Sequence, residues 1–200
     1  MFQQTLGQRG IALADSEYYE RYLGYDDAGV FRAIGIDRRL GWTGADIAEL
    51  VDEKVTSFRA VAEALPVLFD GVAARIREWA PRVPMAIASG AFREEIAIIL
   101  EAAGLRQFFP VIVAAGETPA GKPAPDPYAA ALRLLGADPT RSVAVEDSVW
   151  GIESAHQAGM KVIAITTSYP RDRLTGADIV VGAFTELTLE LFQALAAARS

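Results

Sequence analysis

Residues 142–166 read SVAVEDSVWGIESAHQAGMKVIAIT. Two apolar runs, at 142–145 and 161–166, flank a stretch with helical spacing at 149–158 that stops before Gly159. Short apolar runs without alternation are typical of strands that are covered on both faces. The segment therefore predicts a strand, a helix and a second strand, which is the repeating unit of a parallel sheet.

The same alternation continues on both sides of this segment, from Pro66 to the last residues. The further strands that it predicts lie at 83–88, 111–115 and 179–181, and the further helices at 72–79, 92–103, 126–135 and 185–197. Repeated strand–helix units indicate an α/β domain with a mainly parallel sheet and right-handed crossovers. Ligands of such sheets bind beyond the carboxyl ends of the strands, so polar residues at those ends are the first candidates for a site.

The chain before Pro66 has a different pattern, because it predicts helices only. These lie at 16–23, 26–34 and 43–64, and Thr43 is placed to cap the third of them. We therefore expect two parts, a helical segment over residues 1–66 and a strand-containing core over residues 67–200.

Composition narrows the class of protein. The chain has 200 residues, 52% of them hydrophobic, with a net charge of −7 and no cysteine. The acidic balance argues against nucleic-acid and anionic-membrane partners, and the lack of cysteine excludes disulfides and thiolate metal sites. No apolar run approaches the roughly 18 residues of a membrane span, and the first residues do not resemble a secretory signal. We expect a soluble cytoplasmic protein.

Ser89 and Gly90 follow the apolar run at 83–88 and precede a predicted helix. The serine hydroxyl and the backbone N–H groups of Gly90 and Ala91 would face a ligand at the helix N-terminus, where the helix dipole favours anions. The alternative is that Ser89 is a simple N-cap, since serine is a preferred capping residue.

Lys122 lies in a loop whose backbone is constrained by its neighbours Gly121 and Pro123. A lysine held near the strand ends can pair with a phosphate or neutralise a group of carboxylates. The alternative is an ordinary solvated lysine, which is the usual state of this residue type.

Glu146 and Asp147 come directly after the strand predicted at 142–145. Two adjacent carboxylates repel each other unless a cation lies between them, and hard oxygen ligands of this kind suit Mg²⁺. The alternative is that Asp147 or Ser148 caps the following helix, and both functions are compatible.

Three other residues have plainer interpretations. Asp26 either contacts a substrate or begins a helix. Lys54, on the long helix, is expected to be solvated, and His156, the only histidine, is expected to be structural.

Taken together and in this order, the motifs resemble the haloacid dehalogenase superfamily, and more closely its branch of β-phosphoglucomutase-like and phosphoglycolate-phosphatase-like enzymes. The resemblance covers the chain from about residue 16 to the end. It rests on Ser89 and on four short motifs: Gly121-Lys122-Pro123-Ala124-Pro125-Asp126-Pro127, Val145-Glu146-Asp147-Ser148, Gly151-Ile152 and Ala158-Gly159-Met160.

The resemblance implies a Rossmann-like core with a small α-helical cap, the cap being residues 1–66. It also implies roles for single residues. Ser89, Gly90 and Ala91 would hold the transferring phosphoryl group, Lys122 would balance its charge, and Glu146 with Asp147 would hold Mg²⁺. Lys54 and Asp26 would be contacts from the cap.

The implied activity is Mg²⁺-dependent hydrolysis of a small phosphorylated metabolite through an aspartyl-phosphate. The family's nucleophile lies in an Asp-x-Asp motif after an opening strand at the centre of the sheet. No such strand precedes the helices here, since Met1 to Leu6 already resembles the first cap helix. We therefore expect a central gap in the sheet and negligible turnover by residues 1–200.

Three explanations remain open for the missing opening strand and its Asp-x-Asp motif. In the first the start is set too far downstream, in the second the chain is truncated and a neighbouring chain or segment fills the gap, and in the third the protein is a degenerate relative. We favour the first, because the rest of the motifs are intact. A sugar-phosphate mutase and an inactive phosphate-binding protein are the alternative functions. A chain that is soluble only as a homodimer would indicate that the strand is replaced across subunits.

Overall fold

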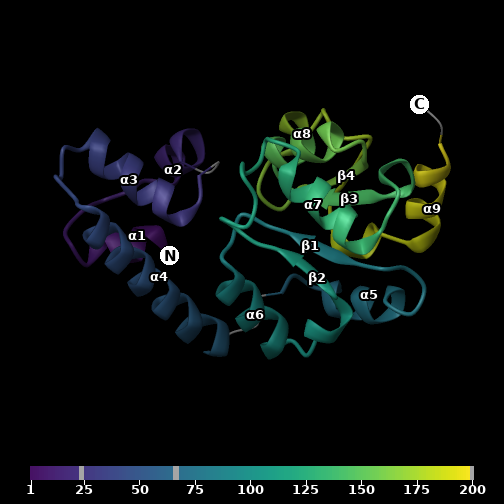
Figure 1. The fold of residues 1–200 in the computed structure, drawn as a ribbon, viewed down its shortest axis with the longest axis horizontal. Helices are drawn as coiled ribbons and strands as arrows, with labels where there is room; N and C mark the ends of the chain where they lie inside the picture. Colours follow the sequence, from purple (N-terminus) through teal and green to yellow (C-terminus); the bar gives the residue numbers. More distant parts are fainter. Residues whose placement is uncertain (23–24, 65–67, 199–200) are drawn as a thin grey trace.

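The structure is a computed structural model that describes residues 1–22, 25–64 and 68–198, with only the backbone of 62–64. Its helices and strands fall into two lobes, which lie side by side in Figure 1. The predicted boundary at Pro66 and the predicted end of a helix at Leu23 lie outside the described residues. Within them, no helix is long and apolar enough to cross a membrane.

Four helices form the helical lobe: α1 (Phe2–Gly7), α2 (Asp15–Arg21), α3 (Asp27–Asp37) and α4 (Gly44–Ala64). They enclose a core of their own, made of Leu6, Leu13, Tyr22, Val30, Phe31, Ile34, Ile47 and Leu50. Thr43 and Asp46 exchange hydrogen bonds at the start of α4, as expected from the sequence, because the Thr43 backbone N–H donates to Asp46 at 2.6 Å and the Asp46 N–H to Thr43 Oγ1 at 3.3 Å.

The second lobe, which we call the strand lobe, alternates helices and strands. Its strands are β1 (Ala86–Ala88), β2 (Val111–Val113), β3 (Val143–Glu146), β4 (Lys161–Ile165) and β5 (Ile179–Val181). Its α-helices are α5 (Val72–Trp79), α6 (Arg93–Ala102), α7 (Asp126–Leu135), α8 (Val149–Gln157) and α9 (Leu189–Ala197), with 3-10 turns η1 (Arg106–Phe108), η2 (Pro139–Arg141), η3 (Arg171–Arg173) and η4 (Phe184–Glu186).

Most predicted elements are present with ends shifted by a few residues. The largest differences in where an element begins concern the strand predicted at 83–88 and the helix predicted at 185–197. The strand is formed only by its last three residues, and Val83 and Met85 pack into the core ahead of it. The helix begins at Leu189, where the Thr188 hydroxyl caps it by accepting the Leu191 N–H at 3.2 Å.

All strand pairs are parallel, as predicted, but they form two sheets. One sheet has the order β1–β2 and the other the order β3–β4–β5. Within the described residues β1 and β3 are not hydrogen-bonded to each other, which confirms the expected interruption. We call the space between these two strands the inter-sheet interval.

Helices cover both faces of the two sheets and keep them in one layer. On one face α6 packs on β1 and β2, while α9 packs with β4 and β5. On the other face α7 packs on β1 and β2, and α8 packs with β3 and β4. The result is the three-layer, Rossmann-like arrangement expected from alternating strands and helices.

Candidate active site

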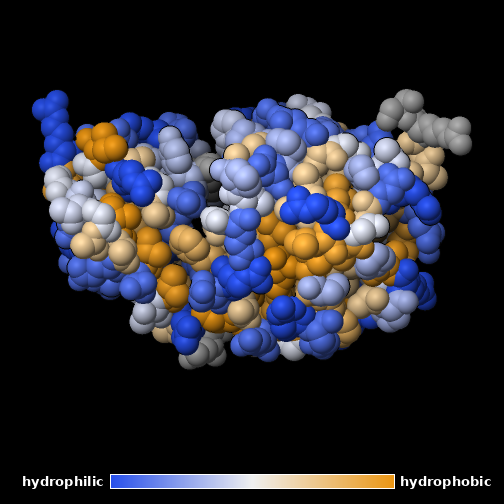
Figure 2. Space-filling view, in the orientation of Figure 1, coloured by the Kyte–Doolittle hydropathy of each residue, from blue (hydrophilic) through white to orange (hydrophobic). Residues whose placement is uncertain are grey.

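The carboxyl ends of both sheets face the helical lobe. Beyond β1, Glu95 on α6 accepts a hydrogen bond from Lys54 of α4 at 2.7 Å. Beyond β4, the ring of Tyr169 lies 6.3 Å from that of Tyr19 on α2. Because β3 is parallel to β4, its carboxyl end faces the helical lobe as well. We call the region where both sheets face that lobe the junction; the molecular outline is notched where the lobes meet (Figure 2).

Lys122 and Glu146 form a partly buried ion pair at this junction. Lys122 Nζ donates to Glu146 Oε1, and the Tyr128 hydroxyl donates to the same oxygen at 2.5 Å. Burial and the nearby Glu146 charge raise the pKa of Tyr128 well above its usual value, so that it stays a donor. The structure therefore places Lys122 as the neutralising partner of a carboxylate, one of the two functions proposed from its sequence context.

Gly151 makes room for the Glu146 carboxylate. A Cβ at position 151 would collide with both carboxylate oxygens of Glu146, although Gly151 is inside helix α8. The glycine of this motif is therefore required for space, because only a residue without a side chain lets the carboxylate lie against the helix.

Asp147 points to a different set of partners. The Ser168 hydroxyl donates to Asp147 Oδ2 at 2.5 Å and the Thr167 hydroxyl to the same oxygen at 3.3 Å. Repulsion between the adjacent carboxylates is thus reduced by separation, since Glu146 is bound to Lys122 and Asp147 to hydroxyl groups. Ser148 caps α8 by accepting the Gly151 N–H at 3.0 Å, as one of the sequence alternatives proposed.

Ser89 lies in a turn after β1 rather than at a helix cap. Its hydroxyl accepts the Ala91 N–H at 3.1 Å, and α6 begins only at Arg93. The interpretation of Ser89 as a simple N-cap is therefore wrong, and the Ala91 N–H, which we expected to face a ligand, is bonded to Ser89 instead. Gly90 is exposed at the tip of this turn.

Lys54 is buried, which contradicts the expectation of a solvated lysine. Its ammonium donates to Asp27 at 2.6 Å and to Glu95 at 2.7 Å, and all three side chains are less than a tenth exposed. Burial raises the pKa of Asp27, although the hydrogen bond and charge of Lys54 oppose that shift. Glu95 also accepts the Phe92 N–H at 3.1 Å, so this triad reaches the turn that holds Ser89.

Asp26 and His156 have structural partners. Asp26 caps α3 by accepting the Gly29 N–H at 2.7 Å, which confirms the interpretation that it begins a helix. His156 lies 3.0 Å from Asp178, which also accepts from Lys161 and from the Val162 N–H. Burial raises the pKa of Asp178, but these hydrogen bonds outweigh it and lower that pKa to about 2.

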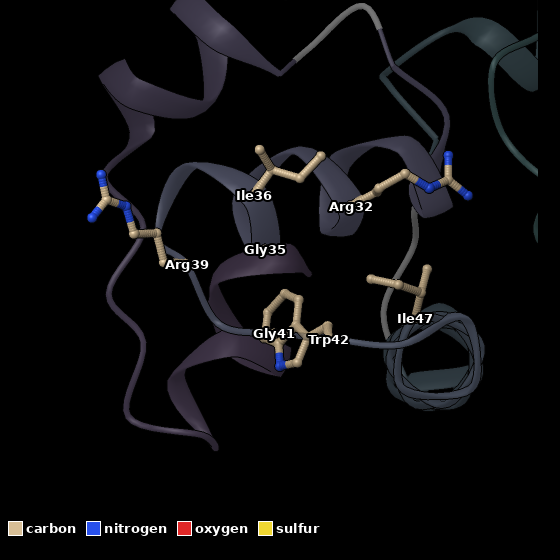
Figure 3. A pocket seen from close by; sticks show the side chains of 7 residues that line it. All are labelled: Arg32, Gly35, Ile36, Arg39, Gly41, Trp42 and Ile47. Carbon is tan, nitrogen blue, oxygen red and sulfur yellow. The ribbon is translucent and has the colours of Figure 1, made fainter.

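Two surface hollows lie away from the junction residues. One of about 370 Å³ is formed by α3, α4 and the segment between them; Trp42 lies at its centre, and Arg32 and Arg39 point away from each other (Figure 3). The other, of about 730 Å³, includes Lys161 and Asp178 near the start of β4. Neither contains Ser89, Lys122, Glu146 or Asp147.

In the part of the chain that the structure describes, no three His, Asp or Glu residues are grouped to hold a metal ion.

Comparison with known proteins assigns the family. The profile described as haloacid dehalogenase-like hydrolase matches residues 1–165. The chain belongs to this family. The confirmed Rossmann-like fold and the motif order at the strand ends agree with that membership.

Several phosphatases resemble this haloacid dehalogenase-like hydrolase. The chain is 35% identical over 108 residues to the chloroplastic 5-amino-6-(5-phospho-D-ribitylamino)uracil phosphatase of Arabidopsis thaliana, covering 54% of this chain and 29% of that protein. It is 34% identical over 90 residues to the fructose-1-phosphate phosphatase YqaB of Escherichia coli, covering 45% and 48%. The chain thus spans less than half the length of these two relatives.

A solved relative matches nearly the whole chain. The crystal structure of CbbY from Rhodobacter sphaeroides in complex with phosphate superposes with a TM-score of 0.83 at 28% identity, covering 97% of this chain and 90% of that one. A second CbbY structure, of a mutant in complex with xylulose-(1,5)bisphosphate, has a TM-score of 0.82 at 28% identity and covers 96% and 89%.

The structure adds residues that the sequence analysis did not single out. Tyr128 is a partner of Glu146, and Thr167 with Ser168 are partners of Asp147. Thr167 and Ser168 directly follow the strand predicted at 161–166. They could have been found from the sequence, because ligands of parallel sheets bind beyond the carboxyl ends of the strands. Tyr128 has no such mark, because it lies inside a helix.

Proposed function

We propose that this protein is the phosphate-binding and metal-binding part of a Mg²⁺-dependent phosphatase acting on a small phosphomonoester. The observation that supports the proposal is the ion pair of Lys122 with Glu146 at the end of β3, next to Asp147. We propose that Ser89, which follows β1 in the neighbouring sheet, faces the same junction. The hydroxyl of Ser89 and the ammonium group of Lys122 can bind the oxygens of a phosphate ester, and a carboxylate oxygen of Asp147 can bind its metal ion.

Each residue has a proposed role in binding. The Ser89 hydroxyl and the Gly90 N–H donate to the phosphoryl oxygens at the exposed turn after β1. Lys122 places positive charge beside the phosphate, and Glu146 with Tyr128 holds its ammonium group in place. We propose that the helical lobe acts as the cap that covers the substrate.

Mg²⁺ would be held by Asp147, because both oxygens of Glu146 already accept hydrogen bonds. Asp147 accepts hydrogen bonds on Oδ2, which leaves Oδ1 available as a hard ligand. Mg²⁺ commonly uses one or two protein carboxylates together with water and substrate phosphate, so the lack of a three-residue cluster among the described residues is compatible with such a site. The bound ion would neutralise charge on the phosphoryl oxygens.

The attacking carboxylate is the remaining requirement, and we propose that a strand in the inter-sheet interval supplies it. The Ser89 N–H donates to Val113 in β2, so by the alternation of a parallel strand Ala86 and Ala88 direct their backbone groups away from β2. The Lys161 N–H donates to Ser142, so Val143 and Val145 likewise direct theirs away from β4. A strand between these edges would pair with both and end beside Ser89 and Asp147.

In that arrangement a carboxylate oxygen attacks phosphorus, the bond from phosphorus to the ester oxygen breaks, and the leaving oxygen takes a proton. Water then hydrolyses the acyl phosphate, which releases inorganic phosphate and restores the carboxylate.

The test separates binding from turnover. Thermal unfolding of residues 1–200 is measured with Mg²⁺ and inorganic phosphate, alone and together, for the wild type, Asp147→Asn and the exposed control Asp52→Asn. We expect the pair of ligands to raise the Tm of the wild type and the control, and to raise that of Asp147→Asn much less. Equal shifts in all three proteins would refute the assigned metal ligand.

Turnover is measured with p-nitrophenyl phosphate on the same chain. We expect negligible hydrolysis, because the attacking carboxylate is assigned to a strand outside residues 1–200. Robust Mg²⁺-dependent hydrolysis would contradict that assignment. Migration of phosphate without its release would favour a mutase, and ligand binding by a chain that stays inactive when a strand is added would favour a binding protein.

A further inference from the structure

Three tyrosines form an aromatic cluster across the junction of the two lobes. The rings of Tyr18 and Tyr19 on α2 are 5.6 Å apart, and Tyr19 meets Tyr169 of the strand lobe edge to face at 6.3 Å and 77°. Tyr18 also packs on the core of the helical lobe, whereas Tyr19 is 45% exposed. The rings of Tyr19 and Tyr169 therefore contribute to the surface of the junction.

Tyr169 directly follows a residue that binds the candidate metal ligand. Its neighbour Ser168 donates to Asp147 at 2.5 Å, and its ring packs against the edge of the α8 core cluster. Burial and the charge of Asp147 raise the pKa of Tyr169, while Arg173 opposes the shift. The ring is thus held by packing next to a partner of Asp147, but belongs to neither the phosphate turn nor the Lys122 pair.

The edge-to-face contact between Tyr19 and Tyr169 leaves part of the Tyr19 ring uncovered. In such a pair the edge of one ring covers part of one face of the other, so the exposed part of Tyr19 can contact another group. Tyrosine rings of this kind commonly bind flat ligand surfaces, because they present apolar area with few rotatable bonds.

Resting on the proposed function, we propose that Tyr19 and Tyr169 determine specificity, by contacting the leaving group of the phosphomonoester and favouring a flat ring over a short open chain. The phosphoryl group lies at Ser89, Lys122 and Asp147, and the leaving group extends from there along the two tyrosine rings. Because one ring comes from each lobe, the contact forms only when the lobes are together.

The test compares ligands that differ only in the ring. Binding of phenyl phosphate, ethyl phosphate and inorganic phosphate is measured by calorimetry with Mg²⁺ for the wild type, Tyr19→Ala, Tyr19→Phe and Tyr169→Ala. Ile36→Ala is the matched control, because Ile36 is an exposed apolar residue of the helical lobe that lines the separate hollow of Figure 3.

We expect the wild type to bind phenyl phosphate about two- to tenfold more tightly than ethyl phosphate, the range expected for an aromatic contact. Tyr19→Ala and Tyr169→Ala should bring this ratio close to one and leave inorganic phosphate binding unchanged. Tyr19→Phe and Ile36→Ala should keep the wild-type ratio.

The outcomes distinguish this inference from the proposed function. If inorganic phosphate binds but the phenyl preference is absent, or persists in both alanine variants, the assignment of the tyrosines is wrong and the phosphate site stands. If inorganic phosphate does not bind in the presence of Mg²⁺, the proposed function fails and the inference fails with it.

Discussion

The carboxylate of Glu146 shows how strongly a single residue here depends on its neighbours. It lies against the backbone of α8, receives hydrogen bonds from Lys122 and Tyr128, and is almost fully buried. A buried charge is tolerated only when it is paired and hydrogen-bonded. The position of this carboxylate therefore depends as much on the glycine beside it as on the lysine in front of it.

Gly151→Ala should destabilise the protein by about 1–3 kcal/mol, the usual cost of overpacking. Alanine in a helix is ordinarily more stable than glycine by about 0.5–1 kcal/mol, so the expected sign is the reverse of the usual one. Urea unfolding measures the change. Gly44→Ala is the control, because a Cβ there meets nothing within 4 Å, and a stabilised Gly151→Ala would show that Glu146 does not need this space.

Asp178→Asn should reduce stability at neutral pH by about 1 kcal/mol, because the folded protein holds the pKa of Asp178 at about 2, below its usual 3.8, and solvent at this exposed position screens much of that effect. A carboxyl group whose pKa is lowered by folding stabilises the folded protein fully when the pH is above the pKa of the unfolded state. This stabilisation is lost as the pH falls through the pKa of the folded state. The difference between the wild type and the variant should therefore shrink as pH falls from about 5 towards 2. Urea unfolding at pH 7 and pH 3 tests this, and a constant difference would contradict it.

At the scale of elements, the triad centred on Lys54 fastens helix α4 to helix α6. Two carboxylates share one ammonium group, and Glu95 also caps the turn before α6. The helical lobe is thereby linked to the turn that carries Ser89 by ionic contacts in a buried position, where their loss leaves a charge without a partner.

Lys54→Met should destabilise the protein by about 3 kcal/mol, because it leaves Asp27 and Glu95 buried without a counter-charge. Asp27→Asn should cost less, since Lys54 and Glu95 remain a neutral pair. Denaturant unfolding of both variants gives the comparison, with exposed Glu78→Gln as a control that should change little. A larger loss for Asp27→Asn than for Lys54→Met would contradict this account of the triad.

Local patterns in the sequence predicted the elements well, and the contacts between them poorly. The helices at 72–79 and 126–135 have the predicted limits, because helical spacing and the stop at Gly136 are local properties. The burial of Lys54 was not predictable, since its partners lie 27 and 41 residues away in sequence. The strand at 83–88 was predicted too long, because apolar composition does not tell whether a residue pairs in a sheet or only packs.

At the scale of the molecule, two sheets share one set of helical layers. Helix α7 packs on β1 and β2 and carries Tyr128, which contacts the end of β3. Helix α5 contributes Trp79 to the core beside β4 and Ile76 to the core beside β1. Side-chain packing rather than backbone pairing therefore holds the two halves of the strand lobe together.

Hydrogen exchange should reveal the inter-sheet interval directly. The amides of Ala86, Ala88, Val143 and Val145 face it, and they should exchange much faster than those inside β4, where strands pair on both sides. Amide exchange followed by NMR at neutral pH resolves these groups. Protection equal to that of Ile163 and Ala164 would mean that the two inner edges are paired.

The unpaired edges of β1 and β3 also affect the solubility of the protein. An unpaired strand edge is a template for pairing with any other chain, and residues 86–88 and 143–145 include neither a charge nor a proline to prevent it. The net charge of −7 keeps separate copies apart at neutral pH, and this repulsion fades near the isoelectric point of about 4.8. Aggregation should therefore set in as the solution is acidified towards that pH, through the same backbone groups that a strand in the interval would occupy.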